Sequence, residues 1–148
     1  MLQIDADAIS AAIEADFEGL LWLRQCRVGC GFGADGERTM DMWGISCKKP
    51  HLHIAVEIKI SRDDFRRDLR SPLKQRRARM LGNQFYFAAP NGLLMADDLP
   101  IWAGLIEVLV SEVVGRNIAN IVVPAPYFDS SPPTWSFVAS LVRRLKKD

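Results

Sequence analysis

The sequence lacks the features that mark a membrane protein, a secreted protein or a strongly charged nucleic-acid-binding protein. No apolar run approaches the roughly 18 residues of a membrane span, so no such helix is expected. The N-terminus has no basic-then-apolar signal pattern, which predicts a cytoplasmic location. The net charge of +1 gives no whole-molecule attraction for nucleic acid. Repeats and low-complexity segments are absent too, and 148 residues at 49% hydrophobic content fit one globular domain, residues 1–148, with its own core.

Cysteine and histidine are scarce, with three and two copies. The spacings Cys26-x3-Cys30 and Cys47-x3-His51 are nevertheless similar to those of zinc ligands. The strands expected around them put the two pairs at opposite ends of a sheet, about 20 Å apart, which argues against one zinc site and against a disulfide. We therefore expect reduced cysteines, and a zinc-stabilised interaction domain is the weakest functional alternative.

The most informative segment that is present is a short strand from Leu52 to Ile60. With a period of two, one face of it is entirely apolar, with Leu52, Ile54, Val56, Ile58 and Ile60. This stripe predicts a core strand. The other face carries Glu57 and Lys59, about 7 Å apart along the strand, together with His53. Charged side chains such as Glu57 and Lys59 beside a core need a partner or a metal. For His53, a structural role is a better interpretation than a substrate contact.

A second acid, Asp41, lies in a strand-like run from Arg38 to Ser46 that a turn over residues 47–50 joins to the first strand. If this hairpin folds about Lys49, positions 41 and 57 lie opposite each other, with Cβ atoms about 4.5–5.5 Å apart. The two carboxylates then converge, and a shift of register by one residue would separate them.

Converging carboxylates repel each other unless a cation neutralises them, and hard oxygen ligands favour Mg²⁺ or Mn²⁺. Such an ion polarises a phosphoryl oxygen and lowers the pKa of bound water, and Lys59 is placed to orient that water. The alternative is a cross-strand ion pair between Lys59 and one of the acids that serves stability alone.

These residues belong to a longer pattern that resembles the PD-(D/E)xK nuclease superfamily. That pattern has an Asp on the second core strand and (D/E)-x-K on the third, here Asp41 and Glu57-Ile58-Lys59. Residues 38–110 resemble more narrowly the MmcB-like DNA-repair branch and related small phage and bacterial proteins. The shared features are VEIK-x-S-R-x-D-F over 56–65, a basic helix, the strand FYFAAP over 85–90 and the strand WAGLIEV over 102–108.

The resemblance implies an α/β fold with a restriction-endonuclease-like core. In that core a helix is followed by three strands that start antiparallel, then by a helix and a further strand, here with extra C-terminal strands and a helix. It also implies a metal-dependent DNA endonuclease that acts in repair or DNA processing. Asp41, Glu57 and the carbonyl of Ile58 would hold Mg²⁺ or Mn²⁺, and Lys59 would act at the water. Glu14 on the first helix is the candidate for an additional catalytic acid. Met40 stands where the superfamily's name has proline.

Basic residues are concentrated just after the Glu-x-Lys strand. Arg62, Arg66 and Arg70 recur every four residues and share one helix face, and arginine suits bidentate phosphate contacts. The residues expected to bind DNA are Arg62, Arg66, Lys74, Arg76 and Arg77. The alternative is a solvated helix, in which repulsion between Asp64 and Asp68 is offset by neighbouring arginines.

The second functional hypothesis is a non-catalytic module on the same fold that binds nucleic acid or a repair partner. A chain of this size has little room for a separate recognition domain, so specificity is expected from a partner or from a homodimer.

The glycine-rich segment over 29–36 is not a phosphate-binding loop, because it lacks the Gly-Lys-Ser/Thr ending.

The remaining elements follow from periodicity, caps and turn residues. Helices are expected over 5–17, 61–70, 72–81 and 133–147, and strands over 20–28, 84–90, 103–110 and late in 112–123. The last helix is expected to bury Trp135, Val138, Leu141, Val142 and Leu145 on one face. The tryptophans are expected in the core. Trp43 is the exception and is a candidate for stacking on a base, because it shares the strand face of Asp41.

Overall fold

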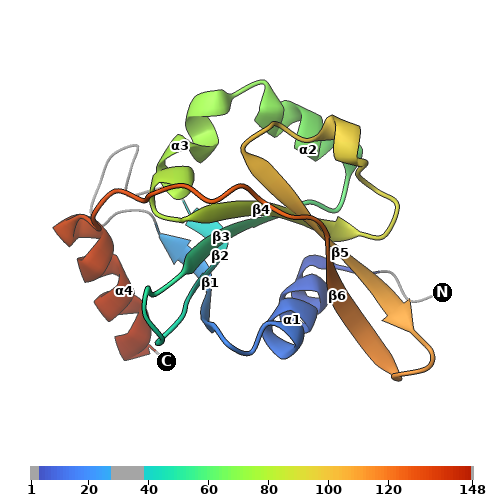
Figure 1. Ribbon diagram of the computed structural model, residues 1–148, viewed down its shortest axis with the longest axis horizontal. Helices are drawn as coiled ribbons and strands as arrows, with labels where there is room; N and C mark the ends of the chain where they lie inside the picture. Colours follow the sequence, from blue (N-terminus) through green and yellow to red (C-terminus); the bar gives the residue numbers. More distant parts are fainter. Residues whose placement is uncertain (1–3, 28–38, 148) are drawn as a thin grey trace.

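The computed structural model describes residues 4–27 and 39–147 (Figure 1). Its elements are α1 (Ala6–Asp16), β1 (Leu21–Arg27), β2 (Thr39–Ile45), β3 (His53–Ile58), α2 (Arg62–Leu69), α3 (Pro72–Met80), β4 (Gln84–Pro90), the short 3-10 helix η1 (Ala96–Asp98), β5 (Ala103–Ser111), β6 (Arg116–Val123) and α4 (Trp135–Lys147). The predicted α/β class is confirmed, and each predicted helix and strand has a counterpart within a few residues. None of the described helices has the length and apolar character needed to cross a membrane.

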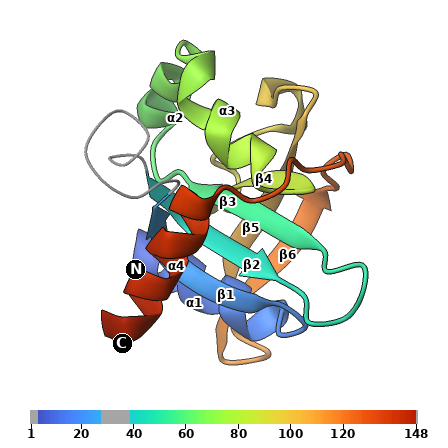
Figure 2. The same ribbon diagram turned by 90° about the vertical axis from the view of Figure 1, so that its left-hand side faces the viewer.

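The six strands form one sheet in chain order, β1-β2-β3-β4-β5-β6. β3, β4 and β5 run parallel, and the pairs at either side, β1–β2, β2–β3 and β5–β6, are antiparallel. Parallel neighbours need a crossover, which α2 and α3 supply between β3 and β4. Those two helices lie over one face of the sheet and α1 lies over the other, while α4 packs beside β1 (Figures 1 and 2).

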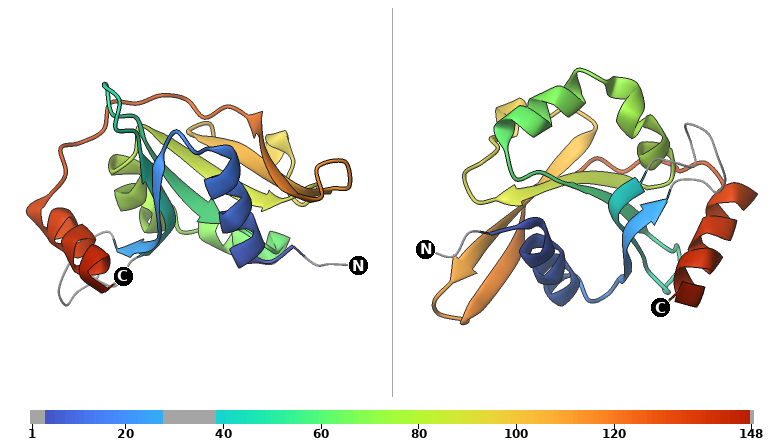
Figure 3. Two further views of the ribbon diagram at one scale, coloured as in Figure 1. Left: turned by 90° about the horizontal axis from the view of Figure 1, so that it is seen from below. Right: turned by 180° about the vertical axis from the view of Figure 1, so that it is seen from behind.

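Two apolar layers, one on each face of the sheet, form the core. Ile9 and Ile13 of α1 pack with Val56 of β3 and its neighbours on one face. On the other face, Phe65 of α2 packs edge-on against Phe87 of β4, with ring centroids 5.0 Å apart. The central strand β4 is buried on both faces, which explains its continuous apolar run. The view from below and the view from behind both show α1 and the α2–α3 pair on opposite sides of this strand (Figure 3).

The β2–β3 hairpin has the register predicted from the turn. Met42 pairs with Val56 and Ile45 with His53, and the mean of each pair of numbers is 49. The strand is shorter than predicted, because it ends at Ile58 and leaves Ile60 half exposed. The alternation within it holds: Ile54 and Val56 face α1, whereas Ala55 belongs to the layer under α2 and α3.

The predicted face of the last helix was right only in part, because Val138 and Leu141 are half-buried whereas Val142 and Leu145 are exposed. Phe137 and Ser140 are the buried residues of α4, while Trp135 is 87% exposed. The reason is tertiary: the ring of Phe137 packs edge-on against Trp43, and the Ser140 hydroxyl donates to the Arg27 carbonyl at 3.0 Å. Both faces of this helix have apolar residues at helical spacing, so periodicity did not decide between them.

Trp43 is a core residue and is not available to stack on a base. It is 8% exposed, and its indole N–H donates to the Leu81 carbonyl at 3.0 Å.

The cysteines that the structure describes also lack a common site, since Cys26 is buried and Cys47 is exposed, while Cys30 lies outside the described residues. Burial raises the pKa of the Cys26 thiol to about 11, so it is protonated and inert at neutral pH.

Candidate active site

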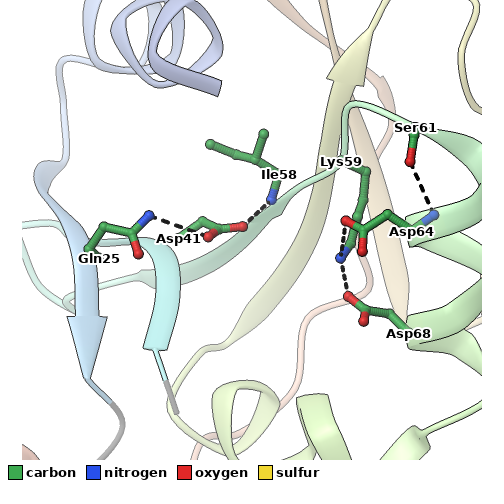
Figure 4. Close-up of polar contacts among 7 residues, drawn as sticks. All are labelled: Gln25, Asp41, Ile58, Lys59, Ser61, Asp64 and Asp68. Atoms are coloured by element: carbon green, nitrogen blue, oxygen red, sulfur yellow. Dashed lines mark hydrogen bonds and ion pairs between the residues drawn. The ribbon is translucent and has the colours of Figure 1, made fainter. Parts of the chain in front are cut away.

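The carboxylate of Asp41 lies just beyond the last paired residues of β2 and β3. Instead of extending the backbone ladder, its Oδ2 accepts a hydrogen bond from the Ile58 backbone N–H at 2.7 Å (Figure 4). Its Oδ1 lies 3.5 Å from the amide nitrogen of Gln25, a β1 residue with a left-handed backbone, φ 51°. The Asp41 side chain is therefore held by contacts with β1 on one side and with β3 on the other.

Glu57 converges with Asp41, as the hairpin register predicts. Its half-buried carboxylate accepts a hydrogen bond from the Asp41 backbone. Burial, followed by the adjacent negative charge of Asp41, raises the pKa of Glu57 to about 8. Burial also raises the pKa of Asp41, in spite of the Ile58 N–H and the nearby Lys59 charge. Two carboxylates whose ionised forms are both disfavoured mark a place where a cation would be stabilising.

Lys59 follows directly after β3 and turns towards α2 (Figure 4). It is 3% exposed, and its ammonium forms ion pairs with Asp68 and, at 3.4 Å, with Asp64. Burial alone would lower the pKa of Lys59, but the hydrogen bond and charge of Asp68 outweigh it, so the pKa is raised. The side chain is thus a fixed cation at neutral pH.

Asp68 is the site residue that the sequence reasoning missed. The repulsion expected between Asp64 and Asp68 is offset by Lys59, which pairs with both acids and which the alternative of a solvated helix did not include. Ser61 begins α2 by accepting from the Asp64 N–H at 3.1 Å, and this start turns the two acids, one helical turn apart, towards Lys59. One pattern in the sequence does indicate that Asp68 is buried. It lies three positions after the apolar Phe65, and residues at this spacing share a helix face.

Glu14 has a partner other than the carboxylate pair. Its side chain forms an ion pair with Arg24 of β1, and among the described residues no hydrogen bond or ion pair joins it to Asp41 or Glu57. Its role as an additional catalytic acid stays a prediction.

Arg62 is also engaged within the chain. Its guanidinium donates to the Leu93 carbonyl at 2.9 Å and lies 3.4 Å from Asp98, so it anchors the connection between β4 and β5. Of the other arginines expected to bind DNA, Arg66 and Arg76 are exposed on α2 and α3. The side chains of Lys74 and Arg77 lie outside the described part of the structure.

His53 lies at the other end of β3 from Glu57, about 13 Å away along the strand. Its Nε2 lies 2.6 Å from the Ser130 hydroxyl and its Nδ1 lies 2.8 Å from the His51 carbonyl. These contacts tie the chain between β6 and α4 to the sheet, which supports the structural interpretation of this histidine.

The carboxylate pair fits Mg²⁺ or Mn²⁺ better than a metal that needs a full protein cage. Within residues 4–27 and 39–147, no three His, Cys, Asp or Glu side chains are grouped to hold an ion by themselves. Mg²⁺ keeps several waters and takes one or two carboxylates with substrate oxygens, so Asp41, Glu57 and the Ile58 carbonyl are a sufficient set.

The pKa of Glu57 predicts how stability depends on pH. A folded-state pKa of about 8 against an ordinary 4.5 means that the folded protein binds more protons than the unfolded chain between these values. Stability without metal is therefore expected to fall as the pH rises from about 5 to about 8. Thermal unfolding in EDTA across this range should show a smaller fall for Glu57→Gln. An equal fall in the two proteins would contradict the assignment.

The chain matches no family model and no curated protein. A solved structure described as the SPO1766 protein of unknown function, from Silicibacter pomeroyi, is similar in fold, with a TM-score of 0.65 and 18% sequence identity. The alignment covers 99% of this chain and 90% of that one. The likeness shows that this fold occurs in another protein.

Proposed function

We propose that the protein is a Mg²⁺- or Mn²⁺-dependent nuclease that hydrolyses phosphodiester bonds in DNA. The observation that carries the proposal is the half-buried pair Asp41 and Glu57, whose ionised forms are both disfavoured, beside a fixed ammonium. The order helix, three strands, two helices and a strand is consistent with the restriction-endonuclease-like core that the sequence resemblance implies.

In this proposal Asp41, Glu57 and the Ile58 carbonyl hold the metal. A divalent ion there would polarise a phosphoryl oxygen and supply a nucleophilic water at neutral pH. Because the pKa of Lys59 is raised, its ammonium stays charged and acts as an electrostatic stabiliser of developing negative charge, so it is not a general base. Asp68 and Asp64 are positioning residues, because they act through Lys59. The exposed guanidiniums of Arg66 and Arg76 would hold the phosphate backbone.

The test is Mn²⁺ binding measured by calorimetry, without nucleic acid and then with a short DNA duplex. The wild-type protein is expected to bind the ion, and the Asp41→Ala, Glu57→Ala double variant is expected to lose that binding. A matched control is Asp63→Ala, Glu112→Ala, which removes two exposed acids elsewhere. Equal binding by the wild-type and double-variant proteins would contradict the assignment of these ligands. Absence of binding by the folded wild-type protein, with and without DNA, would contradict the metal site itself.

The second candidate is a module on the same fold that binds nucleic acid or a repair partner without turnover. The observation in its favour is that Lys59 is already paired with two acids, as a purely structural lysine would be. DNA affinity in EDTA, with no cleavage of single-stranded, duplex or branched DNA in Mg²⁺ or Mn²⁺, would favour this candidate. In either case we propose that a partner protein or a homodimer contributes specificity.

A further inference from the structure

A cavity of about 470 Å³ opens on the same side of the sheet as α2 and α3, away from the carboxylate pair. Its chemically distinctive lining residues are Arg76, Arg79, Phe85, Trp102, Phe128 and Asp129. Phe85 lies three residues before Ala88, which pairs with Ile58, so the cavity begins about 10 Å from the end of β3 along the strands. It is separate from the carboxylate pair, and Arg76 is the one residue that it shares with the phosphate contacts proposed above.

The cationic side of this cavity is built on a stacked arginine. The guanidinium carbon of Arg79 lies 4.0 Å from the ring centroid of Trp102, which holds the group in place. Burial and the neighbouring charge of Arg76 lower the pKa of Arg79, so the two cations disfavour each other. Neither guanidinium forms an ion pair with a residue that the structure describes. An anion between them would relieve this repulsion, and arginine is suited to phosphate.

The aromatic side of the cavity is an exposed ring on a fixed backbone. Phe128 is 51% exposed. Its N–H donates to the Asn83 carbonyl at 2.8 Å, and the buried Asn83 side chain donates back to the Phe128 carbonyl at 3.0 Å. Three residues on, the Ser131 N–H donates to the Met80 carbonyl at 3.2 Å, which ties this connecting segment to α3 (Figure 1). A large apolar ring at the surface, on a backbone that is tied down, is suited to stacking on a flat partner.

We infer that this cavity is a second binding site, for one unpaired nucleotide of a nucleic-acid strand, with its base against Phe128 and its phosphate at Arg76 and Arg79. An aromatic platform beside arginines is the combination by which proteins hold single strands. The inference rests on the proposed function in taking nucleic acid as the ligand. It adds that the substrate contains a single-stranded segment near the cleaved bond. The exposed guanidiniums of Arg66, Arg67 and Arg70 lie on α2 and at its end, in the part of the chain that joins Lys59 to the α3 residues of the cavity.

Asp129 allows a test in which removing one charge strengthens binding and removing the opposite charge weakens it. Its exposed carboxylate lines the same cavity and would repel a bound phosphate. Asp129→Asn is therefore expected to tighten single-strand binding, whereas Arg76→Gln is expected to weaken it. For Arg76→Gln, the slope of log affinity against log salt should also fall by about 0.7, the value for one phosphate contact on a single strand.

The main measurement is fluorescence anisotropy in EDTA, so that binding is measured without turnover, with a labelled short oligothymidylate and a duplex of the same length. Phe128→Ala is expected to weaken binding of the single strand about tenfold and to leave duplex binding unchanged. Phe128→Trp should retain binding. The matched control is Tyr127→Ala, because Tyr127 is a neighbouring ring that is 56% exposed and is not part of the cavity lining. Circular dichroism of each variant checks that the fold is retained.

The outcomes separate this inference from the proposed function. Wild-type affinity in both Phe128→Ala and Arg76→Gln would overturn the inference, even if the protein cleaves DNA. Equal losses on the single strand and on the duplex would overturn the claim that the nucleotide is unpaired. A Phe128-dependent single-strand affinity in a protein that cleaves no DNA would support the inference and overturn the proposed function.

Discussion

Glu57→Ala is expected to abolish metal-dependent DNA cleavage, with a loss of at least about a hundredfold. A metal ion contributes several kcal/mol of transition-state stabilisation, and each 1.36 kcal/mol corresponds to a factor of ten in rate. The measurement is the initial rate of cleavage in Mg²⁺ and in Mn²⁺, with single-stranded, duplex and branched DNA as substrates. The same loss is expected for Asp41→Ala, since the two side chains form one site.

The control for this experiment is Glu112→Ala, which makes the same substitution at an exposed position of the β5–β6 turn. Loss of folding would not explain the expected result, because Glu57→Ala removes a half-buried carboxylate whose ionised form is disfavoured. At pH 8 in EDTA the variant should be at least as stable as the wild-type protein. Full cleavage activity in a folded Glu57→Ala protein would contradict the proposed mechanism.

Asp68→Ala is expected to lower the free energy of unfolding by about 3–5 kcal/mol, the cost of leaving one partner of a buried ion pair without the other. The Lys59 ammonium would remain buried with Asp64, at 3.4 Å, as its remaining ion-pair partner. Urea unfolding at neutral pH measures the change. Asp63→Ala, an exposed acid on the same helix, is the matched control and should change stability by less than about 0.5 kcal/mol.

The double variant Lys59→Met, Asp68→Leu separates stability from catalysis. Replacing both partners of a buried pair by apolar residues is often neutral for stability, so this protein is expected to recover most of the loss caused by Asp68→Ala. It is still expected to be inactive, because the fixed positive charge is gone. A stable double variant that cleaves DNA at the wild-type rate would show that Lys59 serves stability alone. An Asp68→Ala protein as stable as the wild type would contradict the burial of this pair.

The carboxylate pair was predictable because its geometry is local. A strand's period of two and a hairpin of known centre place position 41 opposite position 57 without reference to the rest of the chain. The Ser61 cap is local in the same sense, since its partner Asp64 lies three residues away. The continuous apolar run of β4 likewise predicts a strand that is covered on both faces.

The partners of the charged side chains were less predictable, because they depend on how elements pack. The spacing from Phe65 places Asp68 on the buried face of α2, but it does not show that Lys59 lies opposite that face, so the role of Asp68 was missed. Arg62 was expected to bind DNA, but its guanidinium contacts Asp98, which lies 36 residues away in the sequence. Glu14 forms an ion pair with Arg24. The buried face of α4 depends on a contact with Trp43, which lies on a strand far away in the sequence. Each of these contacts joins separate elements, and no local pattern encodes their relative placement.

The sequence by itself determined the α/β class, the order of the elements and the convergence of Asp41 with Glu57, because periodicity, caps and turn chemistry act over a few neighbouring residues. The tertiary structure alone decided that Lys59 is held by α2 and that Phe128, Trp102 and Arg79 surround one cavity. These arrangements bring together residues from distant segments, and the packing of helices on a twisted sheet sets which of them meet.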